Sequence, residues 1–173
     1  VPMITRRTFL RTASGLALGA IALGGYAFGV EPALRLVATR YAPKPKQWPA
    51  DFPLTIAVVA DVHAVEPWMS AARIRGIVDT TNALGADIIV LLGDYVSGMR
   101  WRSGTVEPAT WAAELARLSA PLGVHAILGN HDYWDDRAAL RRRDGQNASS
   151  SALAAAGIPF TVVPGVSSLA AVP

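Results

Sequence analysis

Three short polar segments, each at the end of an apolar run, hold the residues of this chain that are best suited to chemistry. They are Asp61-Val62-His63, Gly93-Asp94 and Gly129-Asn130-His131-Asp132. Their carboxylate, imidazole and carboxamide groups suit zinc, manganese or iron. Two such ions, roughly 3.5–4 Å apart, activate water and hold a phosphoryl group for in-line attack. The segments therefore predict a centre with two divalent or trivalent metal ions that hydrolyses phosphoesters.

The last of these segments also offers a group for proton transfer. His131 lies one residue beyond Asn130, so an imidazole next to a metal ligand is available to protonate a leaving oxygen or to stabilise phosphoryl oxygens. A carboxylate beside a histidine often orients its ring, which is the role we expect for Asp132. His131 and Asp132 are therefore the predicted catalytic residues.

The polar segments need strands and helices to bring them together. Apolar runs at 54–60, 87–92 and 124–128 predict buried strands. Helical spacing over 70–84 and the stretch 108–118 predict helices between them. The order β-α-β-α-β predicts an α/β fold with right-handed crossovers. In such sheets ligands gather beyond the carboxyl ends of the strands, where all three polar segments lie.

Shorter elements are expected further along the chain. Residues 132–143 are polar and favour a helix, 149–156 favour a short helix, and 160–163 a fourth short strand. His125 falls inside the third strand and is interpreted as a packing residue rather than a ligand. The tryptophans are interpreted as packing residues or pocket walls, namely Trp101, Trp111 and Trp134.

Taken together, the motifs resemble those of the calcineurin-like metallophosphoesterases, whose opening motifs are Asp-x-His, Gly-Asp-x-x-Asp and Gly-Asn-His-Asp/Glu. The second motif departs from the pattern at Ser97, where many members have aspartate. The resemblance spans roughly residues 54–145, the expected metallophosphoesterase domain, and implies the first half of a two-sheet α/β sandwich. It is greatest to the twin-arginine-exported phosphodiesterase branch, some relatives of which act on lipid A precursors.

The resemblance also implies roles for individual residues. Asp61 and His63 would bind the first metal, Asp94 would bridge both metals, and Asn130 would bind the second. His131 would be the catalytic histidine. The expected substrate is a phosphoester, with a phosphodiester favoured and a lipid-linked one as an option.

Members of the family supply further histidines later in the chain, from a second sheet. The last histidine here is His131, and the sequence ends at Pro173. The second half of the sandwich is therefore expected to be missing. This leaves an alternative function open, in which the chain is a truncated and catalytically inactive remnant.

The N-terminus has the pattern of an export signal. Thr5-Arg6-Arg7-Thr8-Phe9-Leu10-Arg11 precedes residues 12–30, which carry no charge. Paired arginines followed by Phe-Leu resemble the twin-arginine signal, so residues 1–30 predict delivery by the twin-arginine translocase to the periplasm. Cleavage at a small-x-small site and retention as a membrane anchor, with a membrane surface as partner, both stay open. Residues 31–53 contain five prolines, four of them between residues 43 and 53, and predict an extended linker.

Composition excludes several function classes. The pI is 9.7, but three of the 16 basic residues lie within the first 30 residues, and the remaining 13 balance 13 acidic residues. A basic nucleic-acid surface is therefore not expected. Because the chain has no cysteine, thiolate metal sites and cysteine nucleophiles are ruled out.

The last part of the chain, residues 146–173, departs from the expected pattern. The stretch from Ala154 to Ser168 resembles a segment of tetrapyrrole methyltransferases. A chimeric or frame-shifted end and a low-complexity apolar tail are the two explanations left open, and a methyltransferase function has no other motif in its favour.

Overall fold

The computed structural model describes residues 5–31, 35–49, 51–134, 136, 141 and 146–162. The chain divides into two compact units, residues 1–42 and 43–173. In the first unit, helix α1 (Arg6–Gly25) continues into a π-helical turn, η1 (Tyr26–Val30). The hydroxyl of Thr5 accepts the backbone N–H of Thr8 and so caps the first turn of α1.

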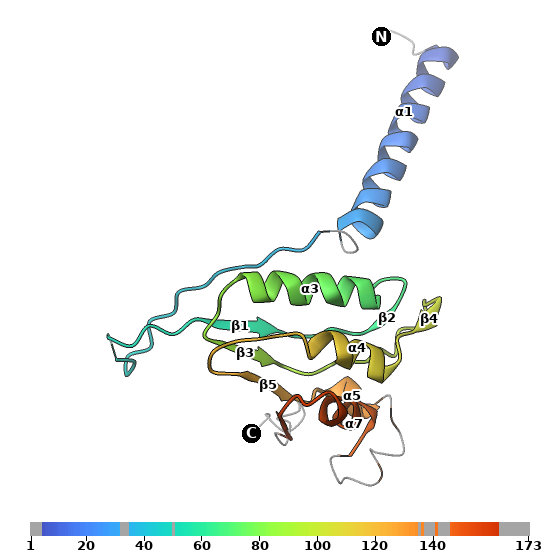
Figure 1. Cartoon of the computed structure of the whole chain (residues 1–173). Coiled ribbons are helices and arrows are strands. Elements are labelled where there is room, and N and C mark those ends of the chain that lie inside the picture. Colours follow the sequence, from blue (N-terminus) through green and yellow to red (C-terminus); the bar gives the residue numbers. More distant parts are fainter. Residues whose placement is uncertain are drawn as a thin grey trace, which may run out of the picture. The chain divides into compact units, whose positions relative to one another are not determined.

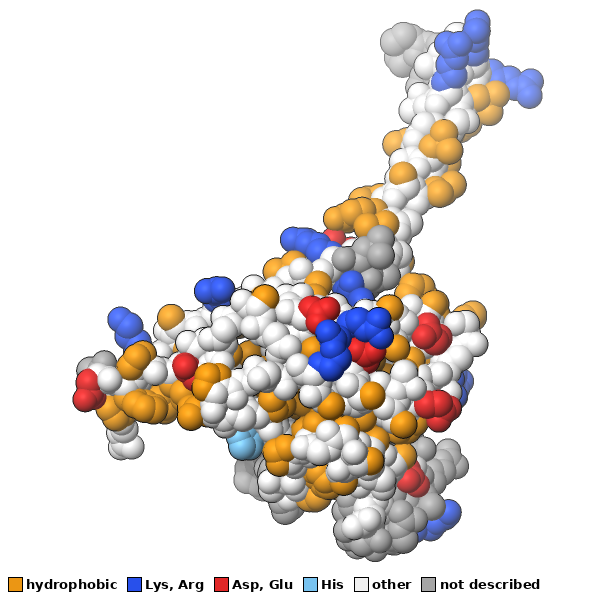
Figure 2. Space-filling view, in the orientation of Figure 1, with side chains coloured by type: hydrophobic (Ala, Val, Ile, Leu, Met, Phe, Trp, Pro, Cys, Tyr) orange, Lys and Arg blue, Asp and Glu red, His pale blue; other side chains and the backbone are white. Residues whose placement is uncertain are grey.

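This helical segment has the composition of a membrane span. Over its 25 residues, Arg6–Val30, it is long and apolar enough to cross a bilayer, and none of it is buried. Figure 2 shows apolar side chains along the helix and basic side chains gathered at its N-terminal end. Length and composition therefore agree with the predicted signal or anchor, and both types of segment have these properties.

The second unit is built on a parallel sheet, as the sequence predicts (Figure 1). The strands lie in the order β1-β3-β5-β6, and each adjacent pair is parallel. Their bounds are β1 (Ile56–Val59), β3 (Ile88–Leu91), β5 (Val124–Ile127) and β6 (Phe160–Thr161). The α/β architecture is thus confirmed, and the carboxyl ends of β1, β3 and β5 lie along one edge.

Helices α3 (Ala71–Ala83) and α4 (Pro108–Leu115) connect these strands. Ser70 caps α3 by accepting the backbone N–H of Arg73, as expected from its position. After α3 the chain turns at Gly85, whose φ of 63° is accessible to glycine at little cost. Helix α4 ends three residues before the predicted bound, at Leu115 rather than Leu118.

Among the described residues of this unit, one face of the sheet is buried and the other is exposed. On the buried face Ala57, Ile89 and Ala126 lie in the core. On the other face Ile56 and Val58 are 50% and 57% exposed. His125 lies in register with Val90 on β3, and its side chain is exposed and contacts the carbonyl oxygen of Leu122 at 3.1 Å. Of the two packing roles predicted for His125, in the core or in the sheet, the place in the core is wrong because the side chain is exposed, and the residue lies in a strand of the sheet as expected.

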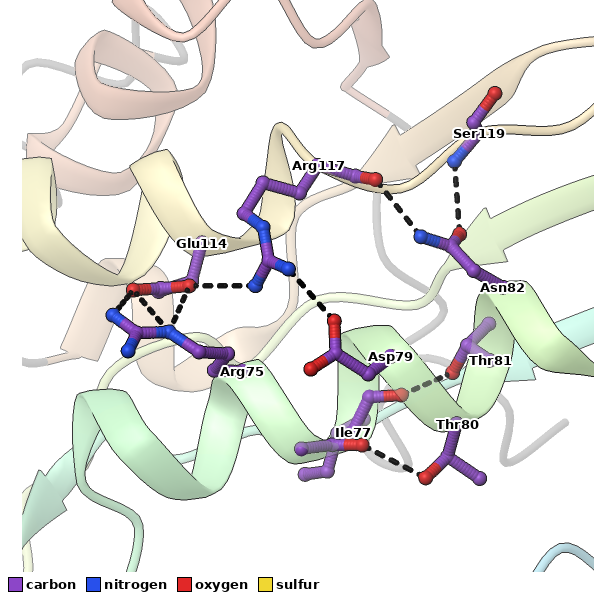
Figure 3. Close-up of polar contacts among 10 residues, drawn as sticks. Arg75, Ile77, Asp79, Thr80, Thr81, Asn82, Glu114, Arg117 and Ser119 are labelled. Atoms are coloured by element: carbon purple, nitrogen blue, oxygen red, sulfur yellow. Dashed lines mark hydrogen bonds and ion pairs between the residues drawn. The ribbon is translucent and has the colours of Figure 1, made fainter.

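An ion-pair network joins α3 to α4 (Figure 3). The guanidinium of Arg75 forms a bidentate contact with Glu114, and Arg117 contacts both Glu114 and Asp79. The hydrogen bonds from Arg75, followed by those from Arg117, lower the pKa of the Glu114 carboxyl below its ordinary value, although burial opposes the shift. Asn82 adds neutral bonds to the Arg117 carbonyl and the Ser119 N–H.

The segment after residue 145 is part of the same domain in its described portion. Helix α7 (Ala148–Ala155) begins with a capping box between Asn147 and Ser150. It packs against α4, and β6 extends the sheet beside β5. The predicted short helix and fourth strand are thus observed, whereas Val163 lies outside the described residues.

Two elements differ from the sequence prediction. The polar helix expected over 132–143 is represented by α5 (Asn130–Trp134), which begins two residues earlier. Residues 135, 137–140 and 142–145 lie outside the described part of the chain. Strands β2 (Val65–Glu66) and β4 (Gly104–Thr105) form an antiparallel pair that the sequence does not signal, because two-residue strands leave no periodic pattern.

Candidate metal centre

Three of the four predicted ligands lie on tight left-handed turns just after the strands. Asp61, His63 and Asp94 have φ values of 53°, 45° and 56°. Aspartate and histidine adopt left-handed backbone more readily than most residues, but the conformation still costs about 1 kcal/mol of free energy at each position. Three residues with left-handed backbone lie at one edge of the sheet, and backbone strain concentrated in this way is found at functional sites.

Two glycines allow the second and third polar segments to touch. A Cβ at Gly93 would collide with the backbone of Gly129, and a Cβ at Gly129 would collide with the Asp94 carboxylate and backbone. Gly93 also has a φ of 89°. Only glycine at both positions permits this approach of the β3 and β5 ends.

The closest cluster of potential ligands contains His63, Asp94 and His131, whose donor atoms all lie within 4.8 Å of one another. The two imidazole rings meet edge to face, with centroids 4.8 Å apart at 85°. The backbone N–H of His131 donates to Oδ1 of Asp94 at 2.8 Å, which ties the third segment to the second. Two imidazoles and a carboxylate are a donor set for zinc, manganese or iron.

The hydrogen bonding of His63 fits this use. Its Nδ1 lies 2.9 Å from the carbonyl oxygen of Val96. A carbonyl only accepts, so Nδ1 carries the proton and Nε2 presents a lone pair. Metal-binding histidines are commonly oriented in this way. The donor set and the tautomer of His63 therefore both fit a metal ion. Oδ1 of Asp61 lies 3.7 Å from Nε2 of His63, at the open side of the cluster.

The buried carboxylate of Asp132 joins the second and third polar segments. Its carboxylate accepts backbone N–H groups from Asp94 at 2.9 Å, Tyr95 at 3.0 Å and Gly129 at 2.8 Å, and the Ser149 hydroxyl at 2.7 Å. The residue is only 2% exposed. Burial raises the pKa of this carboxyl, and the four donors oppose the shift. These contacts give Asp132 a positioning role, while orientation of the His131 ring stays a prediction.

Tyr95 anchors the same turn in the core. It is fully buried, its hydroxyl donates to the Ile127 carbonyl at 3.0 Å, and its ring stacks on Trp111 at 5.0 Å. Burial, reinforced by the nearby Asp132 carboxylate, raises the pKa of the phenol well above its ordinary range. The residue after Asp94 is therefore a neutral, rigid support. Packing is confirmed as the role of Trp111.

The predicted site residues all lie at the carboxyl edge of the sheet, but they do not all gather around one point. His63 and Asp94 join the cluster as predicted ligands, and His131, predicted as catalytic, joins them as a potential ligand. Asp61 is exposed beside it, and Asn130 is exposed at the first residue of α5. Sequence reasoning missed Ser149 and the Val96 carbonyl. Neither carries a local signal, since each acts through a partner 17 or more residues away.

Comparison with known proteins agrees with this geometry. Residues 54–168 match the calcineurin-like phosphoesterase family. The match extends past residue 145 and includes the whole of the segment, residues 154–168, that resembles tetrapyrrole methyltransferases. A protein of Caenorhabditis elegans that is named as a metallophosphoesterase is 42% identical over 81 residues, which are 46% of this chain and 15% of that protein. No solved structure matches the chain. The chain belongs to the calcineurin-like phosphoesterase family.

Proposed function

We propose that this protein is a metal-dependent hydrolase of phosphoesters, and that phosphodiesters are its substrates. One observation carries the proposal. His63, Asp94 and His131 come from three separate chain segments, yet their donor atoms gather within 4.8 Å at the carboxyl edge of the sheet. Because the chain spans only 15% of the relative that it matches, the activity is inferred from this site and from the family.

In this proposal His63, Asp94 and His131 hold metal, with Asp61 and Asn130 at the rim as the further ligands of a two-metal centre. The metal ions, when bound, supply an activated water and neutralise charge on the phosphoryl oxygens. The protein keeps the Nε2 lone pair of His63 available through the bond from Nδ1 to Val96. His131 lies at the same edge and completes the ligand set in this proposal, so we assign protonation of the leaving oxygen to solvent water rather than to this imidazole.

The strained turns and the buried carboxylate serve this site. Asp132 fixes the backbone on both sides of the cluster, so Asp94 and His131 are held in place before substrate arrives. Such preorganisation lowers the cost of reaching the reactive geometry. Tyr95, the residue after Asp94, is fully buried and so anchors the Asp94 turn in the core.

We also propose that the protein works outside the cytoplasm and next to a membrane. The apolar helix Arg6–Val30 and the paired arginines at its start support twin-arginine delivery and retention as an anchor. The basic end of the helix favours the cytoplasmic side, which would leave the domain on the outer side. A phosphoester substrate carried by a lipid suits this location.

The test is hydrolysis by the full chain in detergent, stripped of metal and then supplied separately with manganese, zinc or iron. A phosphodiester and a phosphomonoester of p-nitrophenol serve as substrates. We expect metal-dependent turnover that favours the diester and is lost in Asp94→Ala and His63→Ala. His125→Ala is the matched control, because His125 is exposed on β5 away from the cluster. Folded protein that binds metal but turns over neither substrate would establish the inactive alternative instead.

A further inference from the structure

A strongly exposed aromatic and basic loop follows the second polar segment along the chain. Trp101 is 87% exposed, the highest value among the large apolar side chains described. Met99 is 43% exposed and Trp68 is 41% exposed. Arg100 and Arg102 flank Trp101, both are exposed, and residues 97–106 contain no acidic residue. We call Trp68, Met99, Arg100, Trp101 and Arg102 the aromatic-basic surface.

Hydrogen bonds join the parts of this surface to one another and to the chain segments beside it. The Trp68 indole N–H donates to the Trp101 carbonyl at 3.3 Å, and the Ser103 N–H donates to the Glu66 carbonyl at 3.0 Å. At the start of the loop, Arg102 donates to the Ser97 carbonyl at 3.2 Å. The preceding residue, Val96, is the one whose carbonyl orients His63. The surface therefore follows directly on the metal centre along the chain.

The composition of the surface indicates what it contacts. Leaving a tryptophan almost wholly in water is unfavourable, because the ring is large and apolar. Tryptophan is enriched at the boundary between lipid and water, where the ring is buried while its N–H stays near polar groups. Arginines beside it attract anionic headgroups, with about 1 kcal/mol from each. Together these residues match the interface of an anionic bilayer.

A second observation points to the same partner. The helix Arg6–Val30 is long and apolar enough to cross a bilayer. Residues 35–49 and 51–53 after it have no helix or strand, and the stretch 35–53 at full extension would reach at most about 65 Å. A tether of this length keeps the domain near the bilayer but does not select which side of the domain meets it. A contact on the domain itself is needed for that selection, and two attachments bind far more firmly than one.

We infer that the aromatic-basic surface docks on an anionic lipid bilayer and so holds the metal centre at headgroup level. Met99, Trp101 and Trp68 enter the interface, and Arg100 and Arg102 contact lipid phosphates. This inference rests on the anchor part of the proposed function and is independent of turnover. It narrows the substrate class to phosphoesters that lie at a membrane surface.

The test uses the absence of cysteine in the chain, which lets a single introduced thiol be labelled cleanly. The full-length Met99→Cys protein carries an environment-sensitive fluorophore and is reconstituted in vesicles of phosphatidylcholine, with or without an equal part of phosphatidylglycerol. Lipids that carry a nitroxide quench the fluorophore when it enters the bilayer, so the extent of quenching measures how far the labelled position is immersed. The control is Ala83→Cys, an exposed position at the C-terminal end of α3. Circular dichroism checks that each labelled protein is folded.

We expect several-fold stronger quenching at position 99 than at position 83 in the anionic vesicles. Adding Arg100→Glu and Arg102→Glu to the labelled Met99→Cys protein should remove most of that difference, as should omitting phosphatidylglycerol. Equal quenching at positions 99 and 83 in anionic vesicles would overturn the inference. Because the measurement needs neither metal nor substrate, a failed phosphoesterase assay leaves its outcome unaffected.

Discussion

Oδ2 of Asp132 accepts the backbone N–H of Asp94 at 2.9 Å, so the acidic residue at the end of the third polar segment holds the turn of the second. The same oxygen accepts the Gly129 N–H at 2.8 Å. One buried carboxylate thus spans the ends of β3 and β5. The candidate metal centre depends on this link, because Asp94 lies on the turn after β3 and His131 follows β5 at the start of α5.

Asp132→Asn should therefore disturb both stability and metal binding. The amide places an N–H₂ group where only acceptors fit, and hydrogen bonds to a charged group are the stronger kind, so we expect a loss of about 3 kcal/mol in the free energy of unfolding. Urea denaturation measures it. Ser149→Ala removes one of the four donors and should cost about 1 kcal/mol. An Asp132→Asn protein of unchanged stability would show that the carboxylate has no positioning role.

The glycine at position 129 should be irreplaceable. Gly129→Ala forces its methyl group into the Asp94 carboxylate and backbone, and we expect destabilisation of about 3 kcal/mol or failure to fold. Gly85→Ala has open space but a φ of 63°, so it should cost about 1 kcal/mol. Gly76→Ala, inside α3 with nothing near it, should stabilise the protein by up to about 1 kcal/mol. Thermal unfolding should rank the variants by stability with Gly76→Ala first, Gly85→Ala second and Gly129→Ala last, and a different ranking would contradict the expectation.

Strain at Asp61 predicts an unusual order of stability. At most exposed positions alanine is more stabilising than glycine, but Asp61 has a φ of 53°. Only glycine adopts this backbone without penalty, so Asp61→Gly should be more stable than Asp61→Ala by roughly 0.5–1 kcal/mol. Both variants remove the carboxylate, so metal affinity should fall equally. Denaturation in the absence of metal gives the comparison, and a more stable alanine variant would show that the turn is not strained.

The α3–α4 network predicts a component of acid unfolding. Hydrogen bonds from Arg75 and Arg117 lower the pKa of Glu114, so the folded state binds a proton there less readily than the unfolded chain. Its contribution to stability is complete above the ordinary glutamate pKa of about 4.3 and is lost as pH falls through the lowered pKa. Glu114→Gln should be less stable near neutral pH and lose less stability below about pH 4. If the free energies of unfolding of the two proteins changed in parallel between about pH 6 and about pH 3, this expectation would be contradicted.

Much of the sheet and helix framework follows from the sequence because its signals are local. The apolar runs before Asp61, Asp94 and Asn130 form strands, and Ser70 caps α3 as its hydroxyl predicts. The carboxyl ends of parallel strands necessarily share an edge, which is why the location of the site is also predictable.

The finer structure of the site depends on contacts between distant residues. Ser149 reaches Asp132 only because α7 packs beside α4, and no pattern near residue 149 signals that contact. The contacts of Asp132 with the backbone N–H groups of Asp94, Tyr95 and Gly129 also have no local signal, because two of these residues lie 37 or more positions away. The exposure of Trp101 and His125 likewise depends on what covers each surface, which hydropathy does not report.

The most direct test of the central claim is calorimetric titration of the metal-free full chain with manganese and zinc. We predict saturable binding that weakens at least about tenfold, or 1.4 kcal/mol, when any one of His63, Asp94 and His131 is replaced by alanine. His125→Ala should bind as the unmodified chain does. Equal binding by all four variants, or no binding by folded protein, would contradict a metal centre at this edge of the sheet.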